Sequence, residues 1–409
     1  MNYNEAKELL EKNNQSHLLE YFDELNDEQK EHLLEQISEI DFDLIKLIEN
    51  ADTPDARGVI TPLDAEVSIK DIEENAEKFR AKGLDAIKEG KVAALLLAGG
   101  MGTRLGSDKP KGMYNIGETK DVFIFEMLIR NLMDVVDEAG VWVPLYIMTS
   151  EKNDKDTRNF FEEKNYFGYN KDYVKFFKQE MAPACDFNGK IYLERKDRIS
   201  TSPNGNGGWF ISFAKAGLLD EAKAKGIEYI NLFAVDNVCQ RMADPLFVGA
   251  MIDGGYVSAS KVVSKAAPEE KVGVLCLENG KPSIVEYYEL TEEMRYETLP
   301  DGSLAYKDGV ILNYLFKVED LERNMHNNLV THVVKKKIEC LDENGNSVKP
   351  EIENGYKFET LVLDMIHDMD NCLAYEVVRE KEFAPIKNKT GVDSVDTAKE
   401  LLKKNGVEL

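Results

Sequence analysis

A glycine-rich loop, written GGMGTRLG in the sequence, holds the residue types that a phosphate site needs. Gly99, Gly100 and Gly102 have no Cβ, so backbone amides can crowd around a ligand there. Arg104 and Lys111 follow directly, and two cations beside a polyphosphate suit phosphoryl or nucleotidyl transfer because they neutralise the non-bridging oxygens. The alternative is a tight turn with solvated charges. We favour the phosphate loop, because GGMGTRLG followed by PKGM is more specific than a lone GxGxxG.

The loop differs from two common phosphate-binding motifs. It lacks the GK[ST] ending of a P-loop. It is also a poor dinucleotide fingerprint, because Pro110 follows where that motif continues into a helix. The sequence therefore predicts a phosphate loop of a different class.

A carboxylate follows a second apolar segment, EYINLFAVDN. Asp236 would leave the carboxyl end of a buried parallel strand, which is where such sheets bind ligands. One carboxylate plus substrate phosphates is the usual way to hold Mg²⁺. The alternative is a helix or turn cap, since Asp and Asn cap freely. The phosphate loop upstream favours the metal interpretation.

Two further segments could face a base or a sugar. The glycines of SPNGNGG, among them Gly205, would let backbone approach a flat base or a sugar ring, although turn chemistry alone favours a long turn before the next helix. Gln179 ends the segment YVKFFKQ, and its amide could pair with an imide edge such as that of uracil. A lone Gln is more often a surface residue, so the residues alone leave this choice open.

The elements that must position these residues alternate between strand and helix patterns. Strands are expected over 92–99, 142–150, 173–179, 228–237 and 256–263, and helices over 122–140, 156–165 and 209–226. This alternation predicts an α/β fold with a doubly wound, mixed or parallel, Rossmann-like sheet.

The remaining segments suggest additions to this sheet. Residues 3–50 carry Leu and Ile at helical spacing, and residues 51–66 form a connector. Ser68 and Asp71 could open a further helix with a capping box, and 272–316 reads as an inserted antiparallel sheet. We predict an N-terminal helical segment (1–90), a central nucleotidyltransferase-like α/β domain (91–320) and a C-terminal part with a short lobe (321–409).

Composition narrows the classes of partner and the compartment. The chain of 409 residues has 51 basic and 76 acidic side chains, a formal charge of −25, which argues against binding to nucleic acid or an anionic membrane. Five cysteines without a paired spacing indicate a reducing compartment, and the acidic N-terminus is unlike a signal peptide. We therefore expect a cytoplasmic protein.

Beyond these local patterns, the chain resembles the eukaryotic-type UDP-sugar pyrophosphorylase family, and within it the UDP-N-acetylglucosamine pyrophosphorylases. The likeness covers roughly residues 90–390 in order. The segments that carry it are LAGGMGTRLG, PKGMYNIG, YIMTS, YFG, FFKQEMAPA, GKI, SPNGNGG, VDN, ADPLFVG, KVV, VGV, VEYYEL, VVKKKI and YEVVREKEFAPIKN.

The resemblance implies a role for each candidate residue of the site. It assigns the phosphates of UTP to Gly99, Gly100, Gly102 and Thr103, the transition state to Arg104 and Lys111, uracil to Gln179 and Gly205, the sugar to Asn206, Gly273, Glu286 and Asn313, a metal to Asp236 and a phosphate to Lys387. The implied metal is Mg²⁺, with Mn²⁺ as the alternative.

The same resemblance implies the reaction. UTP and a sugar 1-phosphate would give a UDP-sugar and pyrophosphate, by in-line attack of the sugar phosphate on the α-phosphorus. No protein nucleophile is required, because positioning and charge neutralisation supply the catalysis. We expect a monomer or a weak homo-oligomer.

The identity of the sugar depends on a few positions. GNGG resembles the N-acetylhexosamine branch, whereas glucose-specific relatives usually have GHGD. Two phenylalanines typically line the acetyl pocket of that branch, and the matching positions here are Leu361 and Leu363. We therefore predict UDP-N-acetylglucosamine as the product. The alternatives are a UDP-glucose or broad UDP-sugar pyrophosphorylase and, from another class, a non-catalytic sugar-nucleotide sensor.

Overall fold

The structure, a computed structural model, describes residues 1–51, 57–63, 66–324 and 329–409. Part of the predicted connector, 52–56 and 64–65, lies outside the described residues. Contacts divide the chain into two compact units, and each combines three segments. The first consists of Met1–Ala56, Glu180–Gly208 and Leu329–Val362, and the second of Arg57–Gln179, Trp209–Asn328 and Leu363–Leu409. The three consecutive regions predicted from the sequence stay a prediction.

The first unit begins with the predicted amphipathic helices. Asn2 caps the first of them through a capping box with Glu5, and Ala6 and Leu10 are its buried residues. These helices share a small core with the strands of this unit. The helices are α1 (Tyr3–Lys12), α2 (Asp27–Glu39) and α3 (Asp43–Lys46), with 3₁₀ turns at Ser16–Leu19, Phe22–Glu24 and Leu47–Asn50.

The strands of the first unit are short and antiparallel. The longest pair, β16 and β19, continues into β7, and two-stranded ladders join β6 to β10, β8 to β9 and β17 to β18. Their bounds are β6 (Met181–Pro183), β7 (Cys185–Asp186), β8 (Leu193–Arg195), β9 (Arg198–Ile199), β10 (Thr201–Pro203), β16 (Thr331–Lys336), β17 (Cys340–Leu341), β18 (Ser347–Val348) and β19 (Gly355–Thr360).

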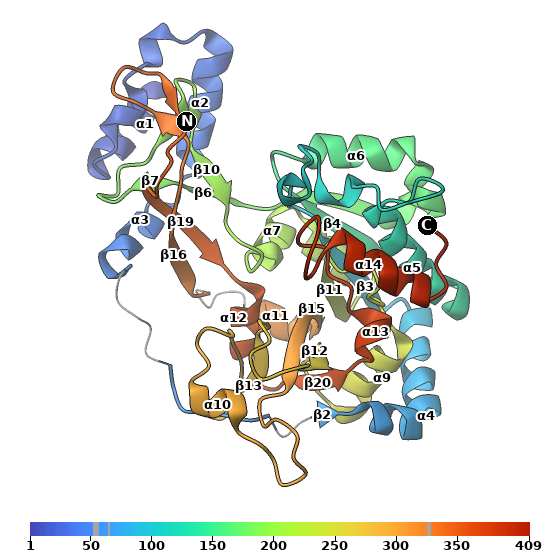
Figure 1. The fold of residues 1–409 in the computed structure, drawn as a ribbon. Helices are drawn as coiled ribbons and strands as arrows, with labels where there is room; N and C mark the ends of the chain where they lie inside the picture. Colours follow the sequence, from blue (N-terminus) through green and yellow to red (C-terminus); the bar gives the residue numbers. More distant parts are fainter. Residues whose placement is uncertain (52–56, 64–65, 325–328) are drawn as a thin grey trace. The chain divides into compact units, whose positions relative to one another are not determined.

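The second unit is built on a large mixed sheet, which confirms the predicted fold class (Figure 1). All six residues of β3 (Val92–Leu97) are buried, as expected for a strand covered on both faces. Parallel neighbours β4 (Leu145–Thr149) and β11 (Tyr229–Ala234) flank it, and β5 (Val174–Lys178) follows β4. Because β3 and β11 run in the same direction, the glycine loop and Asp236 leave the sheet at the same edge.

An antiparallel strand makes the sheet mixed. The long strand β15 (Asp308–Lys317) lies between β11 and β12 (Ser258–Ser264) and is antiparallel to both. Strands β20 (Leu373–Glu376) and β2 (Glu66–Val67) complete that side in parallel with β12. The hairpin β13 (Val274–Glu278) and β14 (Lys281–Val285) joins β15 and β1 (Ile60–Thr61), so an antiparallel insertion is present as predicted.

Helices on this sheet follow the predicted pattern with one difference. The segment 209–226, expected to be a single helix, forms α7 (Trp209–Lys215) and α8 (Leu218–Ala224), because Gly217 adopts a left-handed φ of 74° between them. Ser68 and Asp71 form the predicted capping box of α4. The other helices are α4 (Ile69–Lys88), α5 (Ile124–Ala139), α6 (Asp154–Glu163), α9 (Pro245–Gly254), α10 (Glu292–Tyr296), α11 (Val318–Asn324), α12 (Val362–His367), α13 (Arg379–Glu382) and α14 (Val395–Lys404).

Two general properties accompany this fold. All five cysteines are free, in agreement with their scattered spacing. Among the described residues, none of the helices has the length and apolar character that a membrane crossing requires.

Candidate active site

The glycine loop folds back on itself after β3. The Gly102 amide donates to the Lys109 carbonyl at 2.8 Å, and the Lys111 amide donates to the Gly100 carbonyl at 3.1 Å. From the turn between β4 and α6, the buried Asn153 side chain donates to the carbonyl of Ala98 at 2.9 Å. A Cβ added to Gly100 would meet no atom within 4 Å, so the loop has open space beside its backbone. Such a loop can present backbone amides to an anion.

Gln179 lies against this loop, as a base-reading residue would. A Cβ on Gly99 would stand only 2.4 Å from Gln179 Nε2, so the absence of a side chain at Gly99 makes room for the amide. The backbone of Gln179 is fixed by a hydrogen bond from its amide to the Thr149 carbonyl at 2.8 Å. The structure therefore brings together the predicted phosphate loop and the predicted uracil contact.

Lys111 lies among three other charged candidates. Burial lowers its pKa most, the carboxylate of Asp236 acts in the opposite direction, and the positive charges of Arg104 and Lys387 lower the pKa further. The side chains of Asp236, Arg104 and Lys387 are thus all within electrostatic range of Lys111. With three cations and one carboxylate, this group of side chains is locally positive on a chain of net charge −25, and local positive charge attracts phosphate.

Backbone pairing brings Lys387 to this cluster. The Ile386 amide donates to the Asp236 carbonyl at 2.8 Å, and Asn237 forms an isolated antiparallel bridge with Pro385. Lys387 itself forms an ion pair with Asp393 at 3.0 Å and remains partly exposed. Residues far apart in the sequence therefore present Asp236 and Lys387 side by side.

Glu286 and Gly273 form a second group within range of Lys387. A Cβ on Gly273 would lie 3.7 Å from Glu286 Cδ. Burial and the neighbouring Glu289 raise the pKa of Glu286, whereas Lys387 and Arg57 act to lower it. Lys387 thus interacts electrostatically with both groups, as a residue between a reacting phosphate and a sugar would.

Asn313 occupies a different environment. Its side chain is wholly buried on β15, where Oδ1 accepts from Asn231 at 2.8 Å. Both hydrogens of Nδ2 are directed to Gln240 Oε1 and the Arg241 carbonyl, each at 3.3 Å. The structure uses this side chain inside the core, and its contact with a sugar stays a prediction.

Gly205 and Asn206 belong to the first unit. Gly205 has a left-handed φ of 74°, and a Cβ there would stand 2.1 Å from the Thr360 carbonyl, so only glycine fits. Asn206 Oδ1 accepts from the Val362 amide at 2.9 Å, next to Leu361. These contacts fix the turn against the end of β19. The roles of both residues in uracil and sugar binding stay predictions, as does the role of Leu363, which lies in the second unit.

Asp236 is the residue at which the sequence predicts a metal ion. Among the described residues, no group of three or more His, Cys, Asp or Glu could form a site made of protein side chains alone. One carboxylate beside a phosphate loop fits Mg²⁺, which usually keeps few protein ligands and takes the rest from substrate phosphates and water. The donor set therefore suits Mg²⁺ bound together with a nucleotide.

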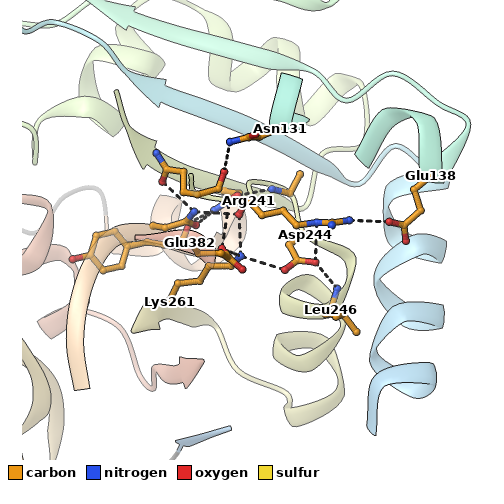
Figure 2. A network of polar contacts seen from close by, with 12 residues as sticks. Asn131, Glu138, Arg241, Asp244, Leu246, Lys261 and Glu382 are labelled. Atoms are coloured by element: carbon orange, nitrogen blue, oxygen red, sulfur yellow. Dashed lines mark hydrogen bonds and ion pairs between the residues drawn. The ribbon is translucent and has the colours of Figure 1, made fainter. Parts of the chain in front are cut away.

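Sequence reasoning missed two buried charged residues close to these segments, Lys261 and Glu382. Lys261 Nζ donates to Glu382 Oε2 at 2.6 Å, and the Lys261 side chain has no exposed surface (Figure 2). Both lie in segments that carry the family resemblance, KVV and YEVVREKEFAPIKN, but the resemblance assigned no role to either residue. The presence of both residues in segments shared with the family was the one sequence signal that could have pointed to them.

Comparison with known sequences gives a consistent result. A protein-family model described as UTP–glucose-1-phosphate uridylyltransferase matches residues 35–398. UDP-N-acetylglucosamine pyrophosphorylase of Saccharomyces cerevisiae is 36% identical, over 95% of this chain and 86% of the yeast protein. UDP-N-acetylhexosamine pyrophosphorylase-like protein 1 of Homo sapiens is 36% identical, over 96% of this chain and 82% of the human protein.

Solved structures extend the likeness to the fold. The uridine diphosphate N-acetylglucosamine pyrophosphorylase of Trypanosoma brucei, solved with an inhibitor, has a TM-score of 0.83 and 28% identity, covering 97% of this chain and 83% of that one. A UDP-glucose pyrophosphorylase of Leishmania major is 17% identical with a TM-score of 0.61, which supports the fold alone.

Proposed function

Because the chain belongs to the family of UTP–glucose-1-phosphate uridylyltransferases, we propose that it transfers a uridylyl group from UTP to N-acetylglucosamine 1-phosphate, giving UDP-N-acetylglucosamine and pyrophosphate. The family and the nucleotidyltransferase class predicted from the sequence are confirmed. The observation that carries the proposal is the cluster of Arg104, Lys111, Asp236 and Lys387 at the end of the glycine loop.

The chemistry follows from this cluster. The open backbone at Gly100 receives the phosphates, and Gln179 beside Gly99 reads the uracil edge. Arg104 and Lys111 neutralise the oxygens around the α-phosphorus, where charge develops as pyrophosphate leaves. An oxygen of the sugar phosphate attacks in line, and the bond from the α-phosphorus to pyrophosphate breaks. The protein contributes orientation and charge without forming a covalent intermediate.

Asp236 is proposed to hold Mg²⁺ together with the substrate phosphates, with Mn²⁺ as the alternative. When bound, the ion offsets the repulsion between the two anionic substrates. The segment of Lys387 pairs with the backbone of Asp236, and Lys387 is proposed to contact the phosphate of the sugar. The negative charge of Asp236 suits a metal ion, and the positive charge of Lys387 suits a phosphate oxygen that the metal does not bind.

The sugar assignment rests on the relatives and on the second group of residues. Relatives at 36% identity are named for N-acetylglucosamine or N-acetylhexosamine, and the structures named for glucose are much less similar. Glu286, whose pKa is raised by burial and by Glu289, is proposed to bond sugar hydroxyls next to Gly273. A glucose-specific or broad UDP-sugar pyrophosphorylase is the competing assignment within the family.

Two broader expectations accompany the proposal. The five free cysteines support a reducing compartment, for which we propose the cytoplasm. We further propose that the enzyme acts as a monomer or a weak homo-oligomer, which light scattering across a range of concentrations would check.

The test is a pyrophosphate-release assay with UTP, Mg²⁺ and a panel of sugar 1-phosphates. We expect release with N-acetylglucosamine 1-phosphate and much slower release with glucose 1-phosphate. Faster release with glucose 1-phosphate would overturn the sugar assignment. No release with any sugar, together with binding of UTP by calorimetry, would replace the enzyme by a sugar-nucleotide sensor.

A further inference from the structure

Two short backbone segments create the neighbourhood of Asp236 and Lys387. The Ile386 amide donates to the Asp236 carbonyl at 2.8 Å, and the Ala384 amide donates to Asn237 Oδ1 at 2.9 Å. Neither segment is a strand of the main sheet at this point; the pairing consists of a single isolated bridge. A pairing this short gives little rigidity by itself, so additional contacts must hold the segments together.

A buried polar network connects the two chain segments that form this pairing, and Figure 2 shows its central residues Arg241, Lys261 and Glu382. Lys261 Nζ on β12 donates to Glu382 Oε2 at 2.6 Å and to the Arg241 carbonyl at 2.9 Å, and it lies 3.2 Å from Asp244 Oδ2. Glu382 Oε2 also accepts from the Arg241 amide at 3.2 Å. The carbonyl of Glu382 accepts from Asn237 Nδ2 at 2.7 Å.

The network joins three parts of the chain that are distant in sequence. Arg241 belongs to the loop that begins at Asp236, Lys261 to a central strand, and Glu382 to the segment that leads to Lys387. Arg241 is anchored in turn by Glu138 on α5, at 2.8 Å. The Lys261 ammonium group therefore bonds to both paired segments, to Arg241 in the segment that begins at Asp236 and to Glu382 in the segment that leads to Lys387.

The desolvation free energy of this buried ion pair opposes folding, so we look for a role of the pair other than stabilising the fold. The Lys261 side chain has no exposed surface, and Glu382 is only 16% exposed. Removing two charges from water has a desolvation penalty of several kcal/mol per ion, and apolar residues of similar size often stabilise a core equally well. Directional bonds to two backbone groups of Arg241 fix geometry in a way that apolar contacts do not.

We propose that Lys261 and Glu382 are positioning residues. They hold the loop 236–241 (the Asp236 loop) against the segment 382–387 (the Lys387 segment), so that the side chains of Asp236 and Lys387 face the same phosphates. The proposal rests on the proposed function for its catalytic consequence. The mechanical part, that the ion pair keeps the two segments together, stands on the contacts alone.

The test uses two variants of the full chain. Lys261→Met removes the ammonium group, and Lys261→Met combined with Glu382→Gln also avoids leaving an unpaired buried carboxylate. The control is Lys307→Met, which removes another partly buried ion pair, Lys307 to Glu66 at 2.8 Å, from the same unit. The Lys307 side chain bonds to Glu66 on β2, which belongs to neither of the paired segments.

Hydrogen exchange provides a readout that does not depend on activity. In both Lys261 variants, we expect faster exchange in the peptides that contain Ala384 and Ile386, whose amides bond to the Asp236 loop. The control should leave these peptides unchanged. Unchanged exchange in a folded Lys261 variant would overturn the proposal.

Steady-state kinetics then measure the catalytic consequence. We expect kcat to fall by about 10²-fold in both variants, because misplacement of about 1 Å at a reacting centre has an effect of that size. KM for UTP should change little, since the glycine loop and Gln179 are not part of the network. A normal kcat despite faster exchange would overturn the positioning role, as would an equal loss of kcat in the control. Absence of activity in the wild type would refute the proposed function, and the exchange result would still decide the mechanical part.

Discussion

Replacing the buried carboxyl of Asp308 by an amide should change how the stability of the second unit depends on pH. Asp308 begins β15 and is 5% exposed. Burial, with the nearby negative charge of Glu66, raises its pKa from 3.8 to about 7; Lys307 opposes the shift and Glu376 adds to it. The folded protein therefore binds this proton more tightly than the unfolded chain does.

The sign and the size follow from that difference. Between pH 4 and pH 7 the folded state holds more protons than the unfolded state, so the free energy of unfolding falls as the pH rises. The full shift corresponds to about 4 kcal/mol, of which about 2–3 kcal/mol falls between pH 5 and pH 8. The amide of Asp308→Asn does not titrate. The free energy of unfolding of this variant, relative to that of the wild type, should therefore increase by about 2–3 kcal/mol from pH 5 to pH 8.

Urea unfolding followed by tryptophan fluorescence measures this effect. Both tryptophans, Trp142 and Trp209, lie in the second unit with Asp308, so the signal reports on the relevant part of the chain. The matched control is Asp301→Asn. Asp301 is exposed, and a hydrogen bond from Ser303 lowers its pKa, so it is ionised throughout the range. A stability difference for Asp308→Asn that does not vary with pH would refute the reasoning.

The other predictions concern the candidate site. Arg104→Ala and Lys111→Ala should each lower kcat by about 10²–10³-fold while the melting temperature stays near the wild type, and near-normal rates would exclude that residue from the chemistry. Asp236→Asn should raise the Mg²⁺ concentration needed for half-maximal rate; an unchanged titration counts against a ligand role. Gly99→Ala places a methyl group 2.4 Å from Gln179 Nε2 and should raise KM for UTP more than it lowers kcat. An unaltered KM would separate Gln179 from uracil binding.

Much of the fold could be predicted because its signals are local. The apolar run of β3 followed at once by glycines identifies a buried strand and its loop without knowledge of any partner. The capping box of α4 is likewise complete within four residues. The break at Gly217 was missed, because a glycine within a helical pattern is usually tolerated and only its left-handed φ ends α7.

The arrangement of the site depends on contacts that sequence patterns do not reveal. Lys261 lies in a strand of serines and small apolar residues and Glu382 in a run of charges, so neither residue stands out before the fold pairs them. Asn313 shows the converse, since the resemblance assigns it to the sugar but its buried side chain bonds to Asn231, Gln240 and Arg241. Both cases depend on long-range contacts: β12 brings Lys261 to Glu382 on α13, and the pairing of β11 with β15 brings Asn231 close to Asn313.

The most direct test of the proposed function is a competition between two sugars. Equal concentrations of N-acetylglucosamine 1-phosphate and glucose 1-phosphate are supplied with UTP and Mg²⁺ in one reaction, and both UDP-sugars are quantified by mass spectrometry. Their initial ratio equals the ratio of the two kcat/KM values. We predict that UDP-N-acetylglucosamine predominates. An excess of UDP-glucose would contradict the sugar assignment, and formation of neither product would contradict uridylyl transfer itself.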